Sequence, residues 1–193
     1  MSGRAVRATA SPAAGAARAA WRLLWAAAFV LATPAVPAGT AGFPATYAPL
    51  VVRPSGLPER ADFDLTGALE RARRENKRLY VYLGADECRY CRAYEAFLER
   101  HARELAPHFS ADWLVVDLRS SLAVPADAVT LRFDGRRRRF AEFQAEIGDE
   151  RGVLVYPNVW LLDPRMRPLM QMPAGAGTFQ TVPEQLEILR LEQ

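Results

Sequence analysis

The hydrophobic pattern from residue 64 to residue 83 changes from a helical to an extended period. Residues 64–76 have the spacing of an amphipathic helix, with Asp64 as its N-cap and Asn76 at its end. Its buried face would hold Leu65, Ala68, Leu69 and Ala72. The run LYVYL at 79–83 is short, apolar and aromatic, which predicts a buried strand followed by a turn at 84–87.

A second helix and a second strand follow. Apolar residues keep a helical spacing from Cys88 to about Leu105, and we expect Pro107 to end this helix. The run WLVVDL at 113–118 predicts another buried strand. Strand, helix and strand within about 40 residues indicate a parallel pair joined by a right-handed crossover.

The remainder of the chain predicts shorter elements. Apolar residues alternate over 129–133, and the dipeptide Asp134-Gly135 is typical of a hairpin turn. A short helix is expected over 140–147, and an apolar stretch containing Pro157 covers 153–162. Residues 168–172 would return as an antiparallel strand. A last helix is expected over 182–191, with Pro183 in its first turn.

The first 38 residues have the order of a secretory signal segment. Basic residues come first, the apolar run LLWAAAFVLA follows Arg22, and small residues with prolines come next. Cleavage is expected after Ala38, with Ala35 and Ala41 as alternatives, and an uncleaved membrane anchor stays open. Residues 39–60 are rich in glycine and proline and are interpreted as a linker, which leaves 61–193 as the folded domain.

The formal net charge of +3 depends on the basic residues of the first 38 positions. Four of the 25 basic residues lie before residue 39, and all 22 acidic residues lie at or after Glu59. The rest of the chain therefore has 21 basic and 22 acidic residues and a net charge of −1. This balance gives no reason to expect a nucleic-acid partner.

The candidate chemistry lies in Cys88-Arg89-Tyr90-Cys91, which contains both cysteines of the chain. The first cysteine falls where a strand ends and a helix begins, so free amide groups and the helix dipole would stabilise its thiolate and lower its pKa. Cys91 lies one turn further along the same side and could resolve a mixed disulfide formed at Cys88. Arg89 and Arg92 would add to this stabilisation, and neighbouring acids would oppose it.

Three other interpretations of the cysteine pair stay open. A structural disulfide closing so small a loop would contribute only roughly 2 kcal/mol in the chain-entropy model. A zinc site wants about four ligands, and the only other soft candidates are His101 and His108, but a copper carrier needs only the two thiolates. The thiols could also be inert in a domain kept for binding.

Two long runs resemble the thioredoxin-like proteins. The run ALERARRENKRLYVYLGADECRYCRAYEAFLER is similar to their active-site region, and FAEFQAEIGDERGVLVYPNVWLLDPRMRPL is similar to their short helix, cis-proline strand and hairpin. The resemblance covers about residues 63–191. It implies an α/β thioredoxin fold, in which a central mixed β-sheet has helices on both faces. The exported context and the tyrosine before the second cysteine resemble periplasmic reductases and disulfide isomerases.

The resemblance also implies roles for single residues. Cys88 and Cys91 would be catalytic, Pro157 would be cis, and Pro157, Tyr156 and Tyr90 would contact the substrate. The implied function is protein-disulfide oxidoreductase activity in the periplasm or another extracytoplasmic space, with the reductase direction favoured. No cofactor and no metal are needed. The implied partners are exported proteins with thiols or disulfides and a membrane or periplasmic electron donor or acceptor.

The chain departs from thioredoxin in the residues around the pair. The buried acid that thioredoxin has in the strand before the site is matched here by Tyr82. Such a carboxylate normally helps to move the proton of the second cysteine, so Glu87 becomes the candidate for proton transfer. Elsewhere, Arg136–Arg139 are expected in a solvated loop or edge strand. The residues expected in the core are Tyr80, Tyr82, Trp113 and Trp160.

Overall fold

The structure is a computed structural model that describes residues 42–149, 152–172 and 181–190. The chain divides into two units, Met1–Ala38 and Gly39–Gln193, and the predicted signal segment lies outside the described residues. No described helix is long and apolar enough to cross a bilayer.

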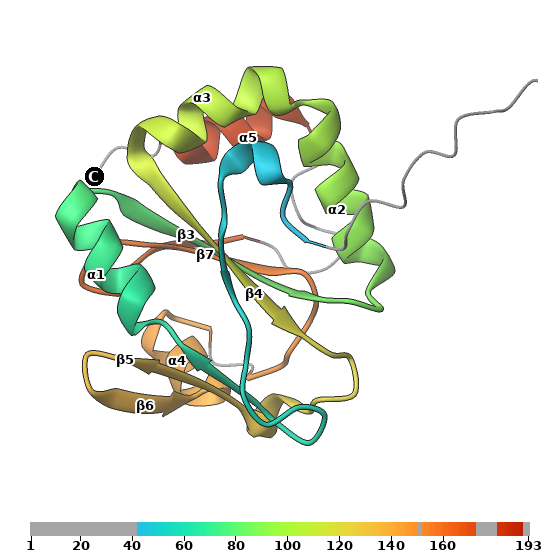
Figure 1. The fold of residues 1–193 in the computed structure, drawn as a ribbon, viewed down its shortest axis with the longest axis vertical. Helices are drawn as coiled ribbons and strands as arrows, with labels where there is room; N and C mark the ends of the chain where they lie inside the picture. The colour runs from blue at the N-terminus through green and yellow to red at the C-terminus, as the bar shows by residue number, and fades with distance from the viewer. Residues whose placement is uncertain (1–41, 150–151, 173–180, 191–193) are drawn as a thin grey trace, which may run out of the picture. The chain divides into compact units, whose positions relative to one another are not determined.

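The larger sheet has five strands in the order β1-β4-β3-β7-β8 (Figure 1). Its strands are β1 (Leu50–Val52), β3 (Arg78–Ala85), β4 (Trp113–Ser120), β7 (Asn158–Leu162) and β8 (Pro168–Gln171). β1, β4 and β3 run parallel, whereas β7 is antiparallel to both β3 and β8. The predicted strands are confirmed, and almost every residue of β3 and β4 is buried, as expected for strands covered on both faces.

A smaller mixed sheet contains β2 (Ala61–Asp64), β5 (Val129–Phe133) and β6 (Arg136–Arg139). β5 and β6 form the hairpin predicted from Asp134-Gly135, and both turn residues have a positive φ. The four arginines form the edge strand of this sheet, so the expectation of a charged edge is confirmed.

Helices cover both faces of the larger sheet (Figure 1). α2 (Arg89–Arg100), α3 (Ala102–Asp112) and α5 (Val182–Leu189) lie on one side, and α1 (Thr66–Glu75) and α4 (Phe140–Glu146) lie on the other. Side chains of β3 alternate accordingly: Tyr80 contacts Phe109 of α3, whereas Val81 packs with Leu69 of α1. The protein is therefore an α/β structure with its core on both sides of β3.

The helix predicted from residue 88 to residue 105 is two helices, so that prediction is wrong in its bounds. α2 ends at His101 and α3 begins at once, with Pro107 inside α3 rather than after it. A proline removes one intrahelical hydrogen bond, but Leu105 and Phe109 on either side of it are buried. Their packing outweighs the lost hydrogen bond and keeps α3 helical.

The predicted linker over 39–60 is also corrected. Its described part contributes β1, which pairs with β4, and a 3-10 turn at Ala45–Tyr47. Phe43 and Tyr47 are buried, and Phe43 makes edge contacts with the rings of Tyr80 and Phe109. The glycines and prolines allow the chain to turn, but the burial of these aromatic rings makes residues 43–52 part of the domain.

The first and last helices keep most of the predicted end signals, although the N-cap of α1 is Leu65 and not Asp64. Asn76 adopts the left-handed conformation that closes α1, and Asp64 accepts a hydrogen bond from the Thr66 amide at its start. α5 begins with Thr181 and Glu184 in a capping box and has its proline in the first turn, as expected.

Candidate functional site

The two cysteines lie where the central strand passes into α2. β3 ends at Ala85, a two-residue turn follows, and Cys88 is the N-cap of α2 with extended backbone angles. Cys88 and Cys91 form a disulfide, and the Cys88 Sγ accepts a hydrogen bond from the Cys91 backbone amide at 3.0 Å. The sulfur therefore takes the place that an oxygen takes in an ordinary N-cap, and the Cys91 amide and the helix dipole both favour negative charge on it.

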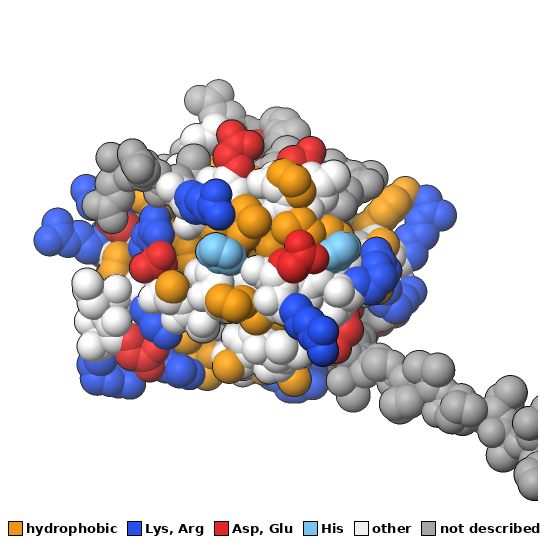
Figure 2. Space-filling view, turned by 90° about the horizontal axis from the view of Figure 1, so that it is seen from above, with side chains coloured by type: hydrophobic (Ala, Val, Ile, Leu, Met, Phe, Trp, Pro, Cys, Tyr) orange, Lys and Arg blue, Asp and Glu red, His pale blue; other side chains and the backbone are white. Residues whose placement is uncertain are grey.

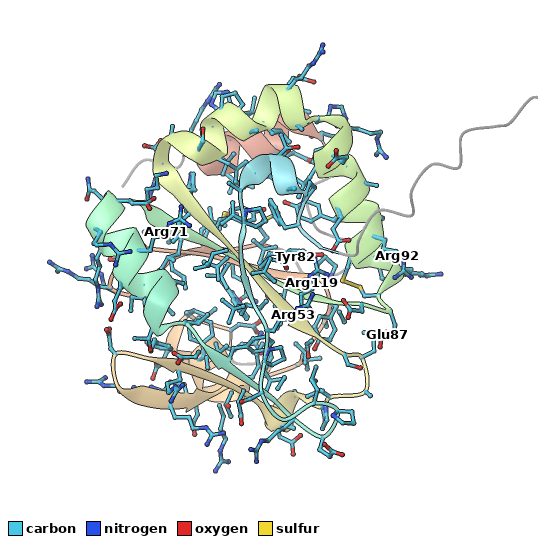
Figure 3. All side chains as sticks on the ribbon, in the orientation of Figure 1. Arg53, Arg71, Tyr82, Glu87, Arg92 and Arg119 are labelled. Atoms are coloured by element: carbon cyan, nitrogen blue, oxygen red, sulfur yellow. A yellow bond between two sulfur atoms is a disulfide. The ribbon has the colours of Figure 1, made fainter. Side chains whose placement is uncertain are left out.

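The pair is shielded from solvent, but the residues between the cysteines are exposed. Cys88 is 3% exposed, Cys91 is fully buried, and Tyr90 is 42% exposed. The Arg89 guanidinium donates to the Tyr90 hydroxyl at 2.5 Å and lies over its ring. Arg92 donates to the carbonyl oxygens of Asp86 and Glu87, so this arginine holds the turn before Cys88 (Figure 3).

Glu87, the candidate for proton transfer, is exposed and braces a neighbouring loop. Its carboxylate accepts hydrogen bonds from the Leu122 amide at 3.3 Å and from the Ser121 hydroxyl at 3.4 Å. Its own backbone amide and that of Leu122 lower the pKa of Glu87. A lower pKa makes this carboxylate a weaker base. Its contacts therefore support a structural role, in which it holds the loop after β4, over a role in proton transfer.

Tyr156 and Pro157 lie beside the strand that leads to the cysteines. Asn158 pairs with Leu83 across the antiparallel β7 and β3, which places the two preceding residues next to the C-terminal end of β3. The Tyr156–Pro157 bond is cis, as expected. Tyr156 is largely buried, and burial raises the pKa of its hydroxyl. The structure thus brings both predicted docking residues to the end of the sheet that carries Cys88.

Four buried polar side chains lie on the α2 side of the sheet, and we call them the buried ionic cluster: Tyr82, Glu95, Asp117 and Arg119. Oε1 of Glu95 accepts hydrogen bonds from the Tyr82 hydroxyl at 2.8 Å and from Arg119 Nη2 at 2.7 Å. Nε of Arg119 forms an ion pair with Asp117 at 2.9 Å. The Arg119 guanidinium also lies over the Tyr82 ring, 5.3 Å from its centre (Figure 3). The Arg119 guanidinium is therefore the counter-charge of both the Glu95 and the Asp117 carboxylate.

Burial dominates the electrostatics of this cluster. It raises the pKa of Asp117, although Arg119 and the Phe43 amide act against the rise. Burial alone would lower the pKa of Arg119, but Asp117 and Glu95 outweigh it, so the pKa is raised and the guanidinium stays charged. Burial and then the charge of Glu95 raise the pKa of Tyr82, which stays a hydrogen-bond donor.

Sequence reasoning missed this cluster, although the sequence holds a signal for it. The strand predicted over 113–118 would have Asp117 next to its end, where a charged side chain has little meaning, but β4 continues to Ser120 and Asp117 is inside it. Asp117 and Arg119 interrupt an otherwise apolar strand at positions that share one face. Glu95 likewise interrupts the apolar face of α2, four residues after Cys91. Charges on two packed faces indicate a buried ion pair.

The two histidines lie away from the cysteine pair. His101 joins α2 to α3 and contacts Glu104 at 3.3 Å, and His108 lies in α3. Both are visible on the face seen in Figure 2, where hydrophobic side chains are mixed with acidic and basic ones. In the described part of the chain, no group of three or more histidine, cysteine, aspartate or glutamate side chains is arranged to hold a metal ion.

No protein-family model, curated protein or solved structure matches the chain.

Proposed function

We propose that this protein is an exported thiol–disulfide oxidoreductase of the thioredoxin-like family, acting in the reductase direction on disulfides of other extracytoplasmic proteins. The observation that carries the proposal is the position of Cys88. Its sulfur caps a helix and accepts the amide of Cys91, and the two sulfurs are close enough to form a disulfide. A thiolate in this position is stabilised, and a thiolate is the nucleophile in disulfide exchange.

The arrangement of the larger sheet supports a thioredoxin fold. Two parallel strands, β1 and β4, lie on one side of β3, and an antiparallel hairpin of β7 and β8 lies on the other. The cysteines follow the central strand, and the cis-proline precedes the antiparallel neighbour. The second sheet of β2, β5 and β6 would be an addition to this fold, inserted between β4 and α4 and completed by β2.

In the proposed reaction, the two cysteines have separate roles. The Cys88 thiolate attacks a disulfide of the partner and forms a mixed disulfide, and one partner sulfur leaves as a thiolate. Cys91 then attacks the Cys88 sulfur and releases the second partner thiolate. Cys88 and Cys91 are left as a disulfide, which an external dithiol donor must reduce before the next turnover.

The partner would dock at the end of the larger sheet that carries Cys88, along the backbone edge of the buried Tyr156 and Pro157, and the exposed Tyr90 ring would be available to contact it. Val155, next to this edge, is also exposed. An extended peptide segment carrying the target disulfide would fit such an edge. The dithiol donor would be a periplasmic or membrane protein, in keeping with the predicted signal segment.

The pH dependence of alkylation tests this proposal. We expect reduced Cys88 to react with iodoacetamide with an inflection well below the ordinary thiol pKa of about 8.5. Cys88→Ser should abolish this fast reaction, and Cys91→Ser should retain it. An ordinary thiol profile, or a Cys91 that reacts first, would contradict the proposal.

A further inference from the structure

We propose that Glu95 accepts the proton of Cys91 when Cys91 resolves the mixed disulfide, and that Tyr82 and Arg119 position its carboxylate. The proposal rests on the proposed function, because it concerns the second step of that reaction. The strand position that holds a buried acid in thioredoxin is occupied here by Tyr82, and Glu87 is exposed and engaged with the loop after β4.

The helix geometry places Glu95 next to Cys91. Both residues belong to α2, four positions apart, and both are buried, with Glu95 8% exposed. Side chains at this spacing lie on one face of a helix, with about 5–6 Å between their Cβ atoms. Helical side chains also lean towards the N-terminus of their helix, so Glu95 covers the turn that begins at Cys91. At this spacing the carboxylate would lie within reach of the thiol of reduced Cys91, directly or through one water molecule.

The hydrogen bonds of Glu95 leave one oxygen available for a proton. Oε1 accepts from both Tyr82 and Arg119, whereas Oε2 has no hydrogen-bond donor among the described residues. The two donors come from neighbouring strands, since Tyr82 lies in β3 and Arg119 in β4. The carboxylate is therefore held from the sheet while its second oxygen stays free.

Glu95 is largely shielded from bulk water, with its side chain 9% exposed, because its neighbours in the buried ionic cluster are closely packed. Gly84 follows Tyr82 on the same face of β3, and a side chain there would come within 2.8 Å of the Tyr82 ring. On the far side of the cluster, the Phe43 amide donates to Asp117 at 2.9 Å. The charged groups facing Glu95 are then Arg119 and Asp117 from β4, with the Tyr82 hydroxyl from β3. A carboxylate in such a shielded site exchanges protons with its neighbour more effectively than an exposed one.

The step balances in protons and electrons. Cys91 transfers its proton to Glu95 as its sulfur bonds to the Cys88 sulfur, the mixed disulfide breaks, and the partner sulfur leaves as a thiolate. The cysteine pair loses two electrons and the partner gains them. Glu95 then releases its proton to solvent or to the leaving thiolate, and the dithiol donor restores the pair.

Reaction with Ellman's reagent separates the two steps in the reduced protein. Cys88 releases one thionitrobenzoate when it forms a mixed disulfide, and Cys91 releases the second when it resolves that disulfide. In Glu95→Gln, we expect the second phase to slow by about 100-fold or more at pH 7, the lower range for general base catalysis, while the first phase changes less than twofold. In Glu95→Gln the rate of the second phase should also rise with pH over the whole range measured, whereas in the unmodified protein this rate should level off.

Glu99→Gln is the matched control, because Glu99 lies one turn further along α2 and is exposed. Tyr82→Phe is a second variant that keeps the carboxylate but removes one of its donors, and it should slow the second phase several-fold. Glu95→Asp should restore part of the rate. An unchanged second phase and pH profile in Glu95→Gln, or in Tyr82→Phe if Glu95→Gln does not fold, would overturn the proposal. A missing first phase in the unmodified protein would instead contradict the proposed function.

Discussion

Replacing Arg119 with methionine should destabilise the protein strongly. The guanidinium is the only cation in the buried ionic cluster, with ion pairs of 2.7 Å to Glu95 and 2.9 Å to Asp117. Methionine keeps much of the apolar stem but leaves two buried carboxylates without a counter-charge. Breaking a buried ion pair by removing one partner costs about 3–5 kcal/mol, and we expect the loss in free energy of unfolding to lie in this range at pH 7.

The effect should depend on pH. In Arg119→Met the two carboxylates can avoid an unpaired charge only by taking up protons, and this becomes easier as the pH falls. The difference in stability from the unmodified protein should therefore shrink between pH 8 and pH 5. Arg137→Met is the matched control, since Arg137 makes an ion pair of 2.6 Å to Asp62 at the surface. Exposed pairs contribute only about 0–1 kcal/mol.

Urea unfolding followed by tryptophan fluorescence at pH 5 and pH 8 measures both effects, with the cysteine pair kept oxidised in all samples. The reasoning would be refuted if Arg119→Met cost no more than Arg137→Met. A large loss that is the same at both pH values would also refute it, because packing and not charge would then explain the loss.

Three further substitutions test the surroundings of the site. Gly84→Ala should cost about 1–3 kcal/mol, because the new Cβ would lie 2.8 Å from the Tyr82 ring, and unchanged urea unfolding would contradict this contact. Phe43→Ala should cost about 3–5 kcal/mol if residues 43–52 belong to the core, and less than 1 kcal/mol if they are a linker. Burial raises the pKa of Asp117, so the unmodified protein loses stability as the pH rises through that pKa. Asp117→Asn lacks the titrating group and should lose less stability than the unmodified protein between pH 4 and pH 7. Identical losses in the two proteins would contradict the burial of the Asp117 carboxylate.

Much of the fold could be predicted from the sequence because the pattern and the end signals agreed. The strand at 79–83 is apolar without interruption, as a central strand must be, and Asn76 marked the end of the helix before it. The cysteines could be placed at the start of a helix from the same pattern. These features are local, so a single sequence contains enough information to place them.

The errors arose where tertiary packing outweighed a local signal. Pro107 indicated the end of a helix, but burial of Leu105 and Phe109 keeps the helix intact on both sides of it. The glycines and prolines of 39–60 indicated a linker, but the ring of Phe43 packs into the core. The ion pair between Glu95 and Arg119 joins a helix to a strand 24 residues away, and helical or strand periodicity carries no information on such pairing.

The proposed reductase activity depends above all on the reduction potential of the Cys88–Cys91 pair. This potential can be measured by equilibrating the protein with glutathione and dithiothreitol mixtures and counting free thiols by mass spectrometry. For a reductase we expect a value near −270 mV, as in thioredoxin, whereas a value near −120 mV would mean that the pair exchanges disulfides as an oxidant. A potential well below about −300 mV, typical of structural disulfides, or a pair that forms no disulfide, would rule out the proposed exchange activity.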